Sequence, residues 1–320
     1  MDNLKSPSYI ESIYTDKVYV QTKQTNHFVS VPEYDQPVTQ YFLQAMILKK
    51  YLPEEPSILD IGCFDGKLLQ EFQKVSSKAS LHGFDIDEQR RDLVPEDIIF
   101  WSEDLVQVTE TFDLICLSHS IQYILDIPAL FENLKRLLKK NGIIFIQVPN
   151  LLKNYYAILY GDLYYYYTPE VIEAIFSFFG FGFKNIDKKG WFDTDIVGAA
   201  MVLENSEPKK VPDNNVMSDC LDYFKDMEQG LHKIKNIKDR RIGILGTTIN
   251  AGFASLALDS SLDYFIDENP SKQGSFFHDK PVRHPKTLTN NDVVVLPYGQ
   301  AGNKIKKRFD LKYMGKFILV

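Results

Sequence analysis

From residue 57 onward, short apolar runs alternate with segments in which apolar residues recur at helical spacing. The run SILDI (57–61) precedes KLLQEFQKV (67–75), whose apolar residues fall on one helical face. Further apolar runs follow at 80–85, 97–101, 111–118 and 143–149. Continuous apolar strands that alternate with helices are typical of a parallel sheet covered on both faces. The pattern therefore predicts an α/β fold.

Capping residues predict where two of the helices begin and end. Asp126 precedes a segment with basic residues in its last turns, and Gly142 predicts the end of that helix. Thr168 and the proline after it predict the start of a second helix, which Gly180 ends. The segments FKNIDKKG and GAAMVLEN then predict a final pair of strands.

The length of the chain and one polar stretch indicate two domains. At roughly 150 residues per domain, 320 residues favour two. Residues 206–215, SEPKKVPDNN, are polar and contain two prolines, which is typical of a domain boundary. A second series of apolar runs follows at 241–246, 263–268, 292–297 and 316–320. The expected order is a helical or lid segment 1–55, an α/β domain 56–205, a linker and helix 206–238, and a smaller α/β domain 239–320.

The composition argues against several classes of protein. The net charge of −7 argues against non-specific nucleic-acid binding, and no apolar run approaches the ~18 residues of a membrane span. The amino-terminal segment lacks the basic and apolar regions of a secretory signal. Three widely spaced cysteines without a CxxC pair argue against a zinc site and for a reducing compartment. We therefore expect a cytoplasmic protein that binds no metal, nucleic acid or membrane.

The stretch ILDIGCFDGKLL (58–69) restricts the kind of site that the first domain carries. A buried strand ends in Asp60 and turns through Gly62 and Gly66 into a helix. The spacing differs from that of a phosphate-binding loop, and Phe64 replaces the second glycine of the GxGxxG dinucleotide fingerprint. A methyl-donor site or a simple tight turn remains. An acid-ended strand with GxxxG suits a cationic ligand, such as S-adenosylmethionine with its ammonium and sulfonium groups.

Polar residues follow each of the first four apolar runs. Asp60, Asp85, Glu103 and His119 all come where such a run ends. Ligands of parallel α/β sheets bind outside the carboxyl ends of the strands. We therefore expect these four side chains to line one site.

Over about residues 55–205 the chain resembles the class I S-adenosylmethionine-dependent methyltransferases. LDIGCFDG, HGFDID, WSEDL and FDLICLSHSIQYI are similar to four motifs of that family, in the family's order. The resemblance implies a Rossmann-like seven-stranded domain, S-adenosylmethionine as the cofactor, and ribose binding by Asp85. It places His119 near the methyl group. The residues that it assigns to cofactor binding are Asp60, Gly62, Cys63, Asp65, Gly66, Asp85, Ile86, Glu103, Asp104 and Ser118.

Other stretches resemble one group of that family, the C-methyltransferases of nucleotide-linked deoxysugars. CFDG is similar to the group's first motif, and RIGILGTTINAG and FIDENPSKQGSFFHDKPV to its carboxyl-terminal domain, which implies a smaller Rossmann-like second domain. Two of the group's features are missing. No cysteine precedes Cys63, so the zinc segment is absent from this sequence, and Gly161 and Asp162 stand where the group has a Glu-His pair. The acceptor chemistry is therefore expected to differ.

Several residues are candidates for the acceptor side of the site. His119 is the first candidate base and Asp162 the second, and the alternative for each is a structural role in a loop or turn. The run of tyrosines at 164–167 predicts a segment whose alternate residues pack in the core and line the acceptor. His27 and Tyr34 predict a lid over the site.

The second domain has its own glycine turn. Gly246 and Gly252, with Asp267 after the next apolar run, lack the spacing of a dinucleotide site, which favours a degenerate Rossmann-like domain. The alternative is a ligand site around DENPSKQG, where Lys272 would meet a phosphate.

We therefore predict an S-adenosylmethionine-dependent methyltransferase that acts on oxygen or nitrogen of a small polar acceptor. The expected acceptor is a nucleotide-linked sugar or another glycan precursor, which would place the protein in carbohydrate biosynthesis. The alternatives are a sugar C-methyltransferase and a non-catalytic binding protein whose second domain senses a ligand. The sequence is compatible with a homodimer.

Overall fold

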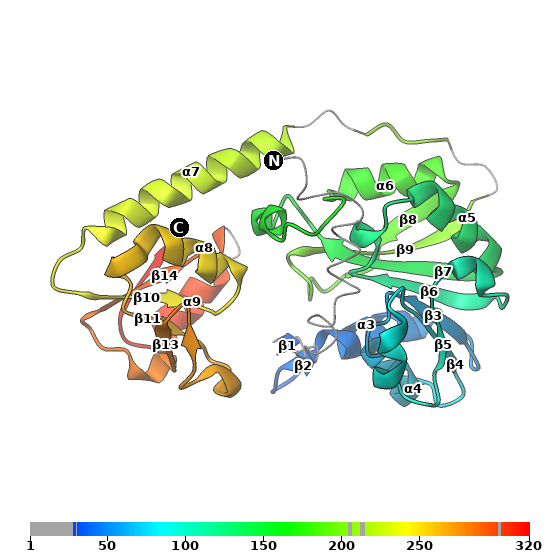
Figure 1. Cartoon of the computed structure of the whole chain (residues 1–320), viewed down its shortest axis with the longest axis horizontal. Coiled ribbons are helices and arrows are strands. Elements are labelled where there is room, and N and C mark those ends of the chain that lie inside the picture. The colour runs from blue at the N-terminus through cyan, green and yellow to red at the C-terminus, as the bar shows by residue number, and fades with distance from the viewer. Residues whose placement is uncertain (1–27, 30, 204–206, 212–214, 300–301) are drawn as a thin grey trace. The chain divides into compact units, whose positions relative to one another are not determined.

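The computed structural model describes residues 28–29, 31–203, 207–211, 215–299 and 302–320, and the chain divides into two units (Figure 1). Unit 1 contains residues 1–150 and 161–212, and unit 2 contains residues 151–160 and 213–320.

Unit 1 is built on a seven-stranded sheet with the strand order β5-β4-β3-β6-β7-β9-β8. The strands from β5 to β7 run parallel, whereas β9 is antiparallel to both β7 and β8. The carboxyl ends of the parallel strands and the amino end of β9 therefore meet at one edge. The bounds, with those of a separate two-stranded sheet, are β1 (Phe28–Val29), β2 (Val38–Thr39), β3 (Ser57–Ile61), β4 (Ser80–Phe84), β5 (Ile99–Trp101), β6 (Phe112–Ser118), β7 (Leu138–Pro149), β8 (Phe181–Asn185) and β9 (Asp195–Val202).

Helices cover both faces of this sheet (Figure 1). Ile58 of β3 packs in the hydrophobic cluster that includes residues of α3 and α4, and Leu59 in the cluster that includes residues of α5 and α6. Successive residues of a strand point to opposite faces, so a strand covered on both is apolar throughout. The helices are α3 (Gln40–Leu48), α4 (Lys67–Val75), α5 (Ile127–Leu137) and α6 (Pro169–Phe178), and the 3₁₀-helices are η1 (Lys49–Tyr51), η2 (Glu88–Leu93), η3 (Leu105–Gln107) and η4 (Ile121–Tyr123).

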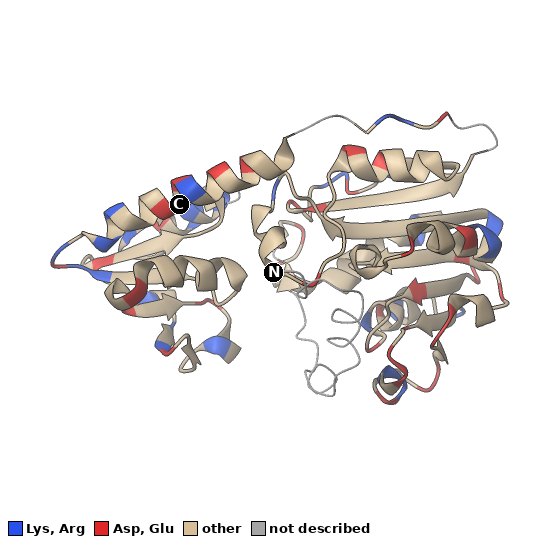
Figure 2. Cartoon of the chain, turned by 45° about the horizontal axis from the view of Figure 1, so that its top comes forward, with Lys and Arg blue, Asp and Glu red and all other residues tan. Residues whose placement is uncertain are grey.

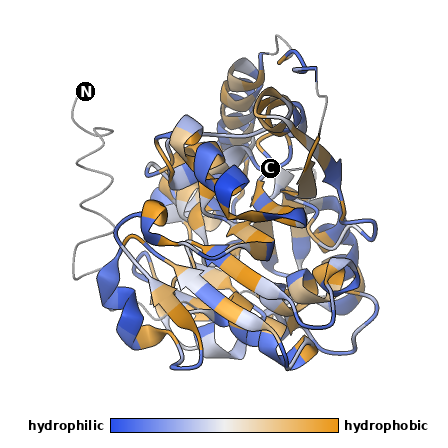
Figure 3. Ribbon diagram, turned by 90° about the vertical axis from the view of Figure 1, so that its right-hand side faces the viewer, coloured by the Kyte–Doolittle hydropathy of each residue, from blue (hydrophilic) through white to orange (hydrophobic). Residues whose placement is uncertain are grey.

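Figure 3 shows hydrophobic and hydrophilic residues mixed along the helices, which is typical of helices that cover a sheet. Figure 2 shows acidic and basic residues distributed over both units. Within the described ranges, no helix is both long and apolar enough to cross a membrane.

The predicted helix starts are confirmed, but one predicted helix end is wrong. The Asp126 carboxylate accepts a hydrogen bond from the Ala129 amide (2.9 Å), and the Thr168 hydroxyl accepts one from Val171 (3.4 Å). However, α5 ends at Leu137, and Gly142 lies inside β7. A Cβ on Gly142 would lie 2.8 Å from the Phe112 carbonyl oxygen, at the point where the β6–β7 register shifts. This glycine therefore permits a close approach of two strands and does not cap a helix.

Unit 2 contains a six-stranded sheet with the order β12-β13-β11-β10-β14-β15, so it is a second, smaller α/β unit. Its strands are parallel except for the pairing of β12 with β13. The bounds are η5 (Tyr155–Leu159), α7 (Val216–Lys235), β10 (Arg241–Leu245), α8 (Ile249–Leu258), η6 (Asp259–Ser261), β11 (Tyr264–Ile266), η7 (Pro270–Lys272), β12 (Phe276–Phe277), β13 (Lys280–Arg283), η8 (Pro285–Thr287), β14 (Asp292–Leu296), α9 (Gly302–Lys312) and β15 (Lys316–Leu319).

The core of unit 2 includes a segment that the sequence alone assigned to the first domain. Tyr156 of η5 is 3% exposed and packs edge-on against Phe224 of α7, with ring centroids 5.4 Å apart. Its hydroxyl donates to the Met227 sulfur (2.8 Å) and accepts from the Tyr223 hydroxyl (3.3 Å). Residues 151–160 are therefore part of the core of unit 2.

Replacing Tyr156 by alanine is expected to destabilise unit 2 by about 3–5 kcal/mol, the usual cost of removing a buried aromatic side chain. Hydrogen exchange should then speed up in β10 of unit 2 and stay unchanged in β3 of unit 1. Tyr160→Ala, in the same segment but 42% exposed, is the control. Faster exchange in β3 instead of β10 would contradict the assignment.

Candidate functional site

Three residues of unit 1 hold a backbone conformation that side chains other than glycine rarely adopt. They are Phe64 (φ 51°), Glu103 (φ 71°) and His119 (φ 55°), and they comprise all non-glycine residues with positive φ in the described part of unit 1. Each follows the carboxyl end of a strand: β3, β5 and β6 respectively. Such strain persists only where the surrounding structure enforces it, and it gathers at functional sites. The strained residues therefore lie at the same edge of the sheet where the sequence predicts a ligand site.

The loop between β3 and α4 lies directly against the segment that follows β6. Gly62 (φ 80°) and Gly66 (φ 72°) both have left-handed backbone conformations. A Cβ on Gly62 would lie 2.7 Å from the Ser120 Cβ, so only glycine fits there. The contact brings the first predicted motif beside the fourth.

Asp60 is a buried acid that forms no ion pair with any described residue. Its side chain is 3% exposed, and Oδ1 is buried without a hydrogen-bond partner among the described residues. Burial, with a smaller contribution from the charge of Asp85, raises the pKa of Asp60 to about 8. An unpaired buried carboxylate is costly. A cationic ligand at this edge would remove that cost.

Asp85 holds the loop in place from the end of β4. Its carboxylate accepts hydrogen bonds from the amides of Phe64 (3.0 Å) and Asp87 (3.1 Å). Burial raises the pKa of Asp85, and these amide bonds partly offset the rise. Each carboxylate oxygen can accept a further bond, so ribose hydroxyls still have acceptors here. Ile86, directly after it, is 60% exposed.

Phe64 is held in its strained conformation by a buried arginine. The Arg90 guanidinium lies 3.9 Å from the centre of the Phe64 ring, and Arg90 is 2% exposed. Its Nε pairs with the Asp87 carboxylate at 3.1 Å. The cation–π contact and the ion pair together compensate the burial of the guanidinium. A bulky ring thus fills the position where a dinucleotide loop needs glycine.

The other predicted cofactor residues differ in what they offer to a ligand. Cys63 is buried, and a Cβ on Gly83 would lie 2.6 Å from its sulfur, so its side chain serves packing. Asp65 pairs with Lys67 at 3.0 Å, and its Oδ1 is buried without a partner in the described structure.

The third predicted motif is exposed at the end of β5. Glu103 accepts a hydrogen bond from the Gln107 amide group (3.4 Å), and Asp104 caps η3 through the Val106 amide (2.9 Å). Glu103 therefore keeps the freer carboxylate of the two.

His119 faces a carboxylate that sequence reasoning missed. Its Nε2 lies 3.5 Å from Oδ2 of Asp195, the first residue of β9. The same oxygen accepts a hydrogen bond from Gln147 of β7 (2.7 Å). His119 pairs with Asp195 and not with Asp162, which is half-buried in the loop that precedes α6. A glutamine inside the apolar run IIFIQVP was the available signal for this network.

Helix α3 completes the network. Gln44 is fully buried, and its side-chain NH₂ group donates to the Gln147 oxygen (2.7 Å) and to the hydroxyl of Ser118 (2.8 Å). Tyr41, one turn earlier, has a buried hydroxyl without a partner among the described residues. Burial, with smaller contributions from the charges of Asp65 and Asp60, raises the pKa of Tyr41 to about 12. Sequence reasoning assigned no role to either residue.

The tyrosine run lies one hydrogen-bond step from His119. The Gln122 side chain donates to the His119 carbonyl (2.9 Å), and the Gln122 carbonyl accepts from the Tyr164 amide (3.0 Å). Tyr167 is buried in the core, and Tyr165, which is half-buried, packs against the same core. Tyr164 and Tyr166 are also half-buried. The predicted role of this run beside an acceptor stays a prediction. Of the predicted lid, Tyr34 packs against Phe42 of α3, and His27 lies outside the described residues.

Buried polar atoms without partners gather around this edge. They belong to α3, to β3 and the loop after it, and to the segment after β6, and all lie within the described structure: Tyr41 Oη, Gln44 Oε1, Asp60 Oδ1, Asp65 Oδ1, Ser120 Oγ and Gln122 Oε1. Buried polar groups normally have partners, so such a cluster is typical of a polar ligand site.

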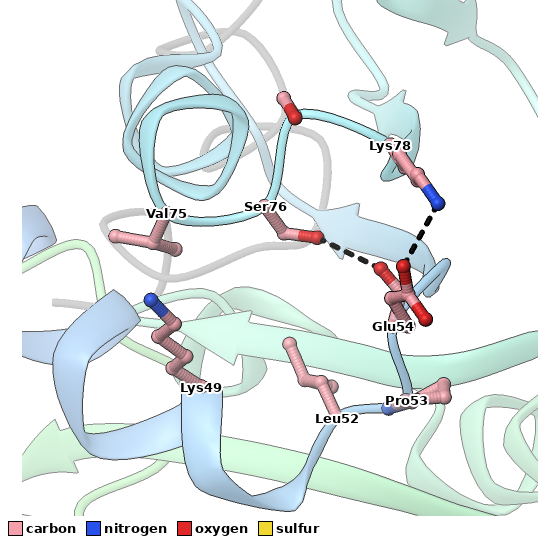
Figure 4. Close-up of a pocket in the computed structure, with 8 residues that line it drawn as sticks. Lys49, Leu52, Pro53, Glu54, Val75, Ser76 and Lys78 are labelled. Carbon is pink, nitrogen blue, oxygen red and sulfur yellow. Dashed lines mark hydrogen bonds and ion pairs between the residues drawn. The ribbon is translucent and has the colours of Figure 1, made fainter.

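A pocket elsewhere in unit 1 is less suited to a ligand. A pocket at the amino ends of β3 and β4 is lined by Lys49, Leu52, Pro53, Glu54, Val75, Ser76, Ser77 and Lys78 (Figure 4). There Lys78 pairs with Glu54 (2.8 Å) and Glu55 (3.0 Å), so its charge is compensated.

The described residues contain no group of three or more His, Cys, Asp or Glu side chains that could hold a metal ion.

In unit 2 a tyrosine side chain of the same unit occupies the space beside the glycine turn. Gly246 has φ 90°, but the Tyr298 hydroxyl lies against it and donates to the Leu245 carbonyl (3.1 Å). Asp267 accepts from the Thr247 hydroxyl (3.2 Å) and from the Asn269 amide (2.9 Å).

Comparison with known proteins identifies the class of unit 1. Residues 33–188 match the family model described as a methyltransferase domain. No curated protein matches the chain. Together with the strand order and the acid-ended β3, the family match defines an S-adenosylmethionine-dependent methyltransferase domain.

Solved methyltransferases and related proteins resemble part of the chain. The plantazolicin methyltransferase BpumL, solved with SAH, is 16% identical, covers 62% of this chain and 95% of its own, and has a TM-score of 0.46. The YcgJ protein from Bacillus subtilis is 14% identical (52% and 99% covered, TM-score 0.43). A TehB-like methyltransferase from Corynebacterium glutamicum is 20% identical (50% and 86% covered, TM-score 0.39).

The residues of the site fit S-adenosylmethionine. The buried Asp60 carboxylate has no cationic partner in the described part of the chain, and the ammonium of the methionine portion would supply one. Asp85 has acceptor capacity for two hydroxyls, and the exposed Ile86 offers an apolar surface for a base. The sulfonium supplies an activated methyl carbon when the cofactor is bound.

Asp60→Asn should stabilise the free protein at high pH. The folded-state pKa of about 8 lies above the ordinary value of roughly 4. The Asp60 carboxyl group therefore lowers the free energy of unfolding progressively as the pH rises from about 4 to about 8. At pH 8 the variant should gain at least about 1 kcal/mol in free energy of unfolding, and at pH 4 nothing. Urea titrations measure this, and added cofactor should stabilise the wild type more than the variant.

Asp113→Asn is the matched control for that experiment. Burial raises the pKa of Asp113, but hydrogen bonds from Lys139 and Ser57 outweigh it and hold the pKa below its usual range. A lowered pKa contributes stability at high pH, so this variant should lose stability at pH 8. Equal effects of the two substitutions would contradict the assignment of Asp60.

Asp85→Ala should weaken cofactor binding by about ten- to a hundred-fold, because it removes the carboxylate that we predict to accept bonds from the ribose hydroxyls and that accepts one from the Phe64 amide of the loop. Calorimetry with S-adenosylhomocysteine measures the affinity, and circular dichroism checks the fold. Asp92→Ala, an exposed acid on η2, should leave the affinity unchanged. Unchanged affinity in Asp85→Ala would remove Asp85 from the site.

Proposed function

We propose that the protein transfers a methyl group from S-adenosylmethionine to an oxygen or nitrogen atom of a small polar acceptor. The acceptor class that we propose is a nucleotide-linked sugar or a related glycan precursor. The observation that carries the proposal is His119, strained at the end of β6 and 3.5 Å from the Asp195 carboxylate. A hydroxyl or amine acceptor needs one such base, whereas a carbon-bound proton demands a stronger one.

Each named residue has one task in this proposal. Asp60 attracts the ammonium of the cofactor, and Asp85 binds its ribose hydroxyls. His119 takes the proton that leaves the acceptor hydroxyl or amine. Most of the remaining rate enhancement would come from holding the reacting atoms in line, since positioning alone can lower a barrier by several kcal/mol.

The residues around His119 support a polar acceptor. Ser120 and Gln122 each keep a buried oxygen without a partner among the described residues. Tyr164 and Tyr166 are half-buried, and the Tyr164 amide donates to the Gln122 carbonyl (3.0 Å). Tyrosine combines a flat apolar ring with a hydroxyl tip, which suits a sugar or a nucleotide base.

The proposed acceptor atom differs from that of the sugar C-methyltransferases. Gly161 has φ 77° and Asp162 follows it, so the Glu-His pair of that group has no counterpart in this loop. The likeness of unit 2 to that group's carboxyl-terminal domain supports the same acceptor class with a different acceptor atom.

Labelled cofactor and a panel of nucleotide sugars test the proposal. The expected result is a product heavier by one methylene group, whose new methyl resonance is bonded to oxygen or nitrogen in two-dimensional NMR. A methyl group on carbon would support the sugar C-methyltransferase alternative. Cofactor binding without turnover over a broad panel would support a non-catalytic binding protein.

His119→Ala should lower turnover by about 10²-fold or more and leave cofactor affinity nearly unchanged, because a base acts only in the transition state. The control is His232→Ala, an exposed histidine on α7, which should keep full turnover. Full turnover in His119→Ala would show that another group, with Asp162 as the next candidate, accepts the proton.

A further inference from the structure

The side chains around His119 form a chain of hydrogen bonds with a fixed direction. A carboxylate can only accept, so the NH₂ group of Gln147 must face Asp195 Oδ2 (2.7 Å). The Gln147 oxygen then faces away and accepts from Gln44 (2.7 Å). Both glutamines are fully buried, so water does not compete for these bonds. This chain of hydrogen bonds therefore holds the Asp195 carboxylate in one place.

The topology brings Asp195 to this edge. It is the first residue of β9, which runs antiparallel to β7 with Asp195 opposite Pro149. An antiparallel strand delivers its amino end to the edge where the parallel strands have their carboxyl ends. The Asp195 amide also donates to the Phe192 carbonyl (3.1 Å), which fixes the strand start.

The backbone holds His119 opposite that carboxylate. Its amide donates to the Gln147 carbonyl (2.8 Å), and its carbonyl accepts from the Gln122 side chain (2.9 Å). The imidazole is 31% exposed, whereas the Asp195 side chain is 15% exposed. One side of the ring thus faces a shielded acid, and the ring remains accessible to an acceptor.

We infer that Asp195 is a positioning residue, which holds His119 with its proton on Nε2 so that Nδ1 can accept the proton of the acceptor. This inference rests on the proposed function. An imidazole with a protonated Nε2 presents an unprotonated Nδ1 as its base. When Nδ1 takes the proton, the resulting imidazolium lies beside the Asp195 carboxylate, which stabilises it.

One carboxylate in the surroundings of His119 can fix its tautomer. Asp195 is the carboxylate within ion-pair distance of the ring among the described residues, and Gln44 and Gln147, from α3 and β7, are uncharged. The acid on β3, Asp60, lies one strand away in the sheet. Removing the charge of Asp195 should therefore weaken the preference for a proton on Nε2, since a carboxylate accepts this hydrogen bond more strongly than an amide oxygen does.

Asp195→Asn keeps the shape of the side chain and an oxygen for Gln147. We expect the ¹⁵N resonances of the His119 imidazole, assigned by their loss in His119→Ala, to show a protonated Nε2 in the wild type and a larger share of the Nδ1-protonated tautomer in this variant. Turnover should fall about 10- to 100-fold with unchanged cofactor affinity. Asp193→Asn, two residues earlier and exposed, should change none of these quantities.

The NMR measurement of the tautomer needs no acceptor, so it separates the two proposals. An unchanged His119 tautomer in Asp195→Asn overturns the inference while leaving the proposed function in place. A double variant of His119→Ala and Asp195→Asn should be no slower than His119→Ala alone, because the two residues act as one unit. If His119→Ala itself keeps full turnover, both the base and its positioning residue are wrong.

Discussion

The arrangement of the site depends on the hydrogen bond from the Phe64 amide to the Asp85 carboxylate (3.0 Å). It joins the loop after β3 to the end of β4 and keeps Phe64 in a left-handed conformation that its side chain disfavours. The ring is then in position to stack on Arg90, and the loop can press Gly62 against Ser120. That contact sets the segment after β6, which begins with His119, beside the loop after β3.

The buried acids at this edge connect stability to function. Asp60 lacks a cation among the described residues, and Asp85 raises its pKa further, so the folded chain carries an electrostatic cost near neutral pH. A hydrophobic residue in place of Asp60 would remove that cost but would offer nothing to an ammonium group. Functional sites commonly retain such destabilising groups, because binding of the ligand compensates them.

The glycine turns of the two units differ in the groups that surround them. In unit 1 the turn at Gly62 and Gly66 is surrounded by buried polar atoms that lack partners within the described chain. In unit 2 the Tyr298 hydroxyl lies against Gly246 and bonds the neighbouring carbonyl. A turn whose open side is filled by a tyrosine has less room for a phosphate.

The sequence by itself determined the α/β class, the two helix starts at Asp126 and Thr168, and the strand ends that carry Asp60, Asp85 and His119. These follow from local patterns, since apolar periodicity and capping depend on neighbours along the chain. Only the tertiary structure decided that Gly142 lies in a strand, that Tyr156 belongs to the core of unit 2, and that Asp195, Gln147 and Gln44 surround His119. These residues are separated by up to 151 positions in the chain, counted from Gln44 to Asp195. An antiparallel β9 and the packing of α3 bring them together, and no local pattern encodes which strand of a sheet will run in reverse.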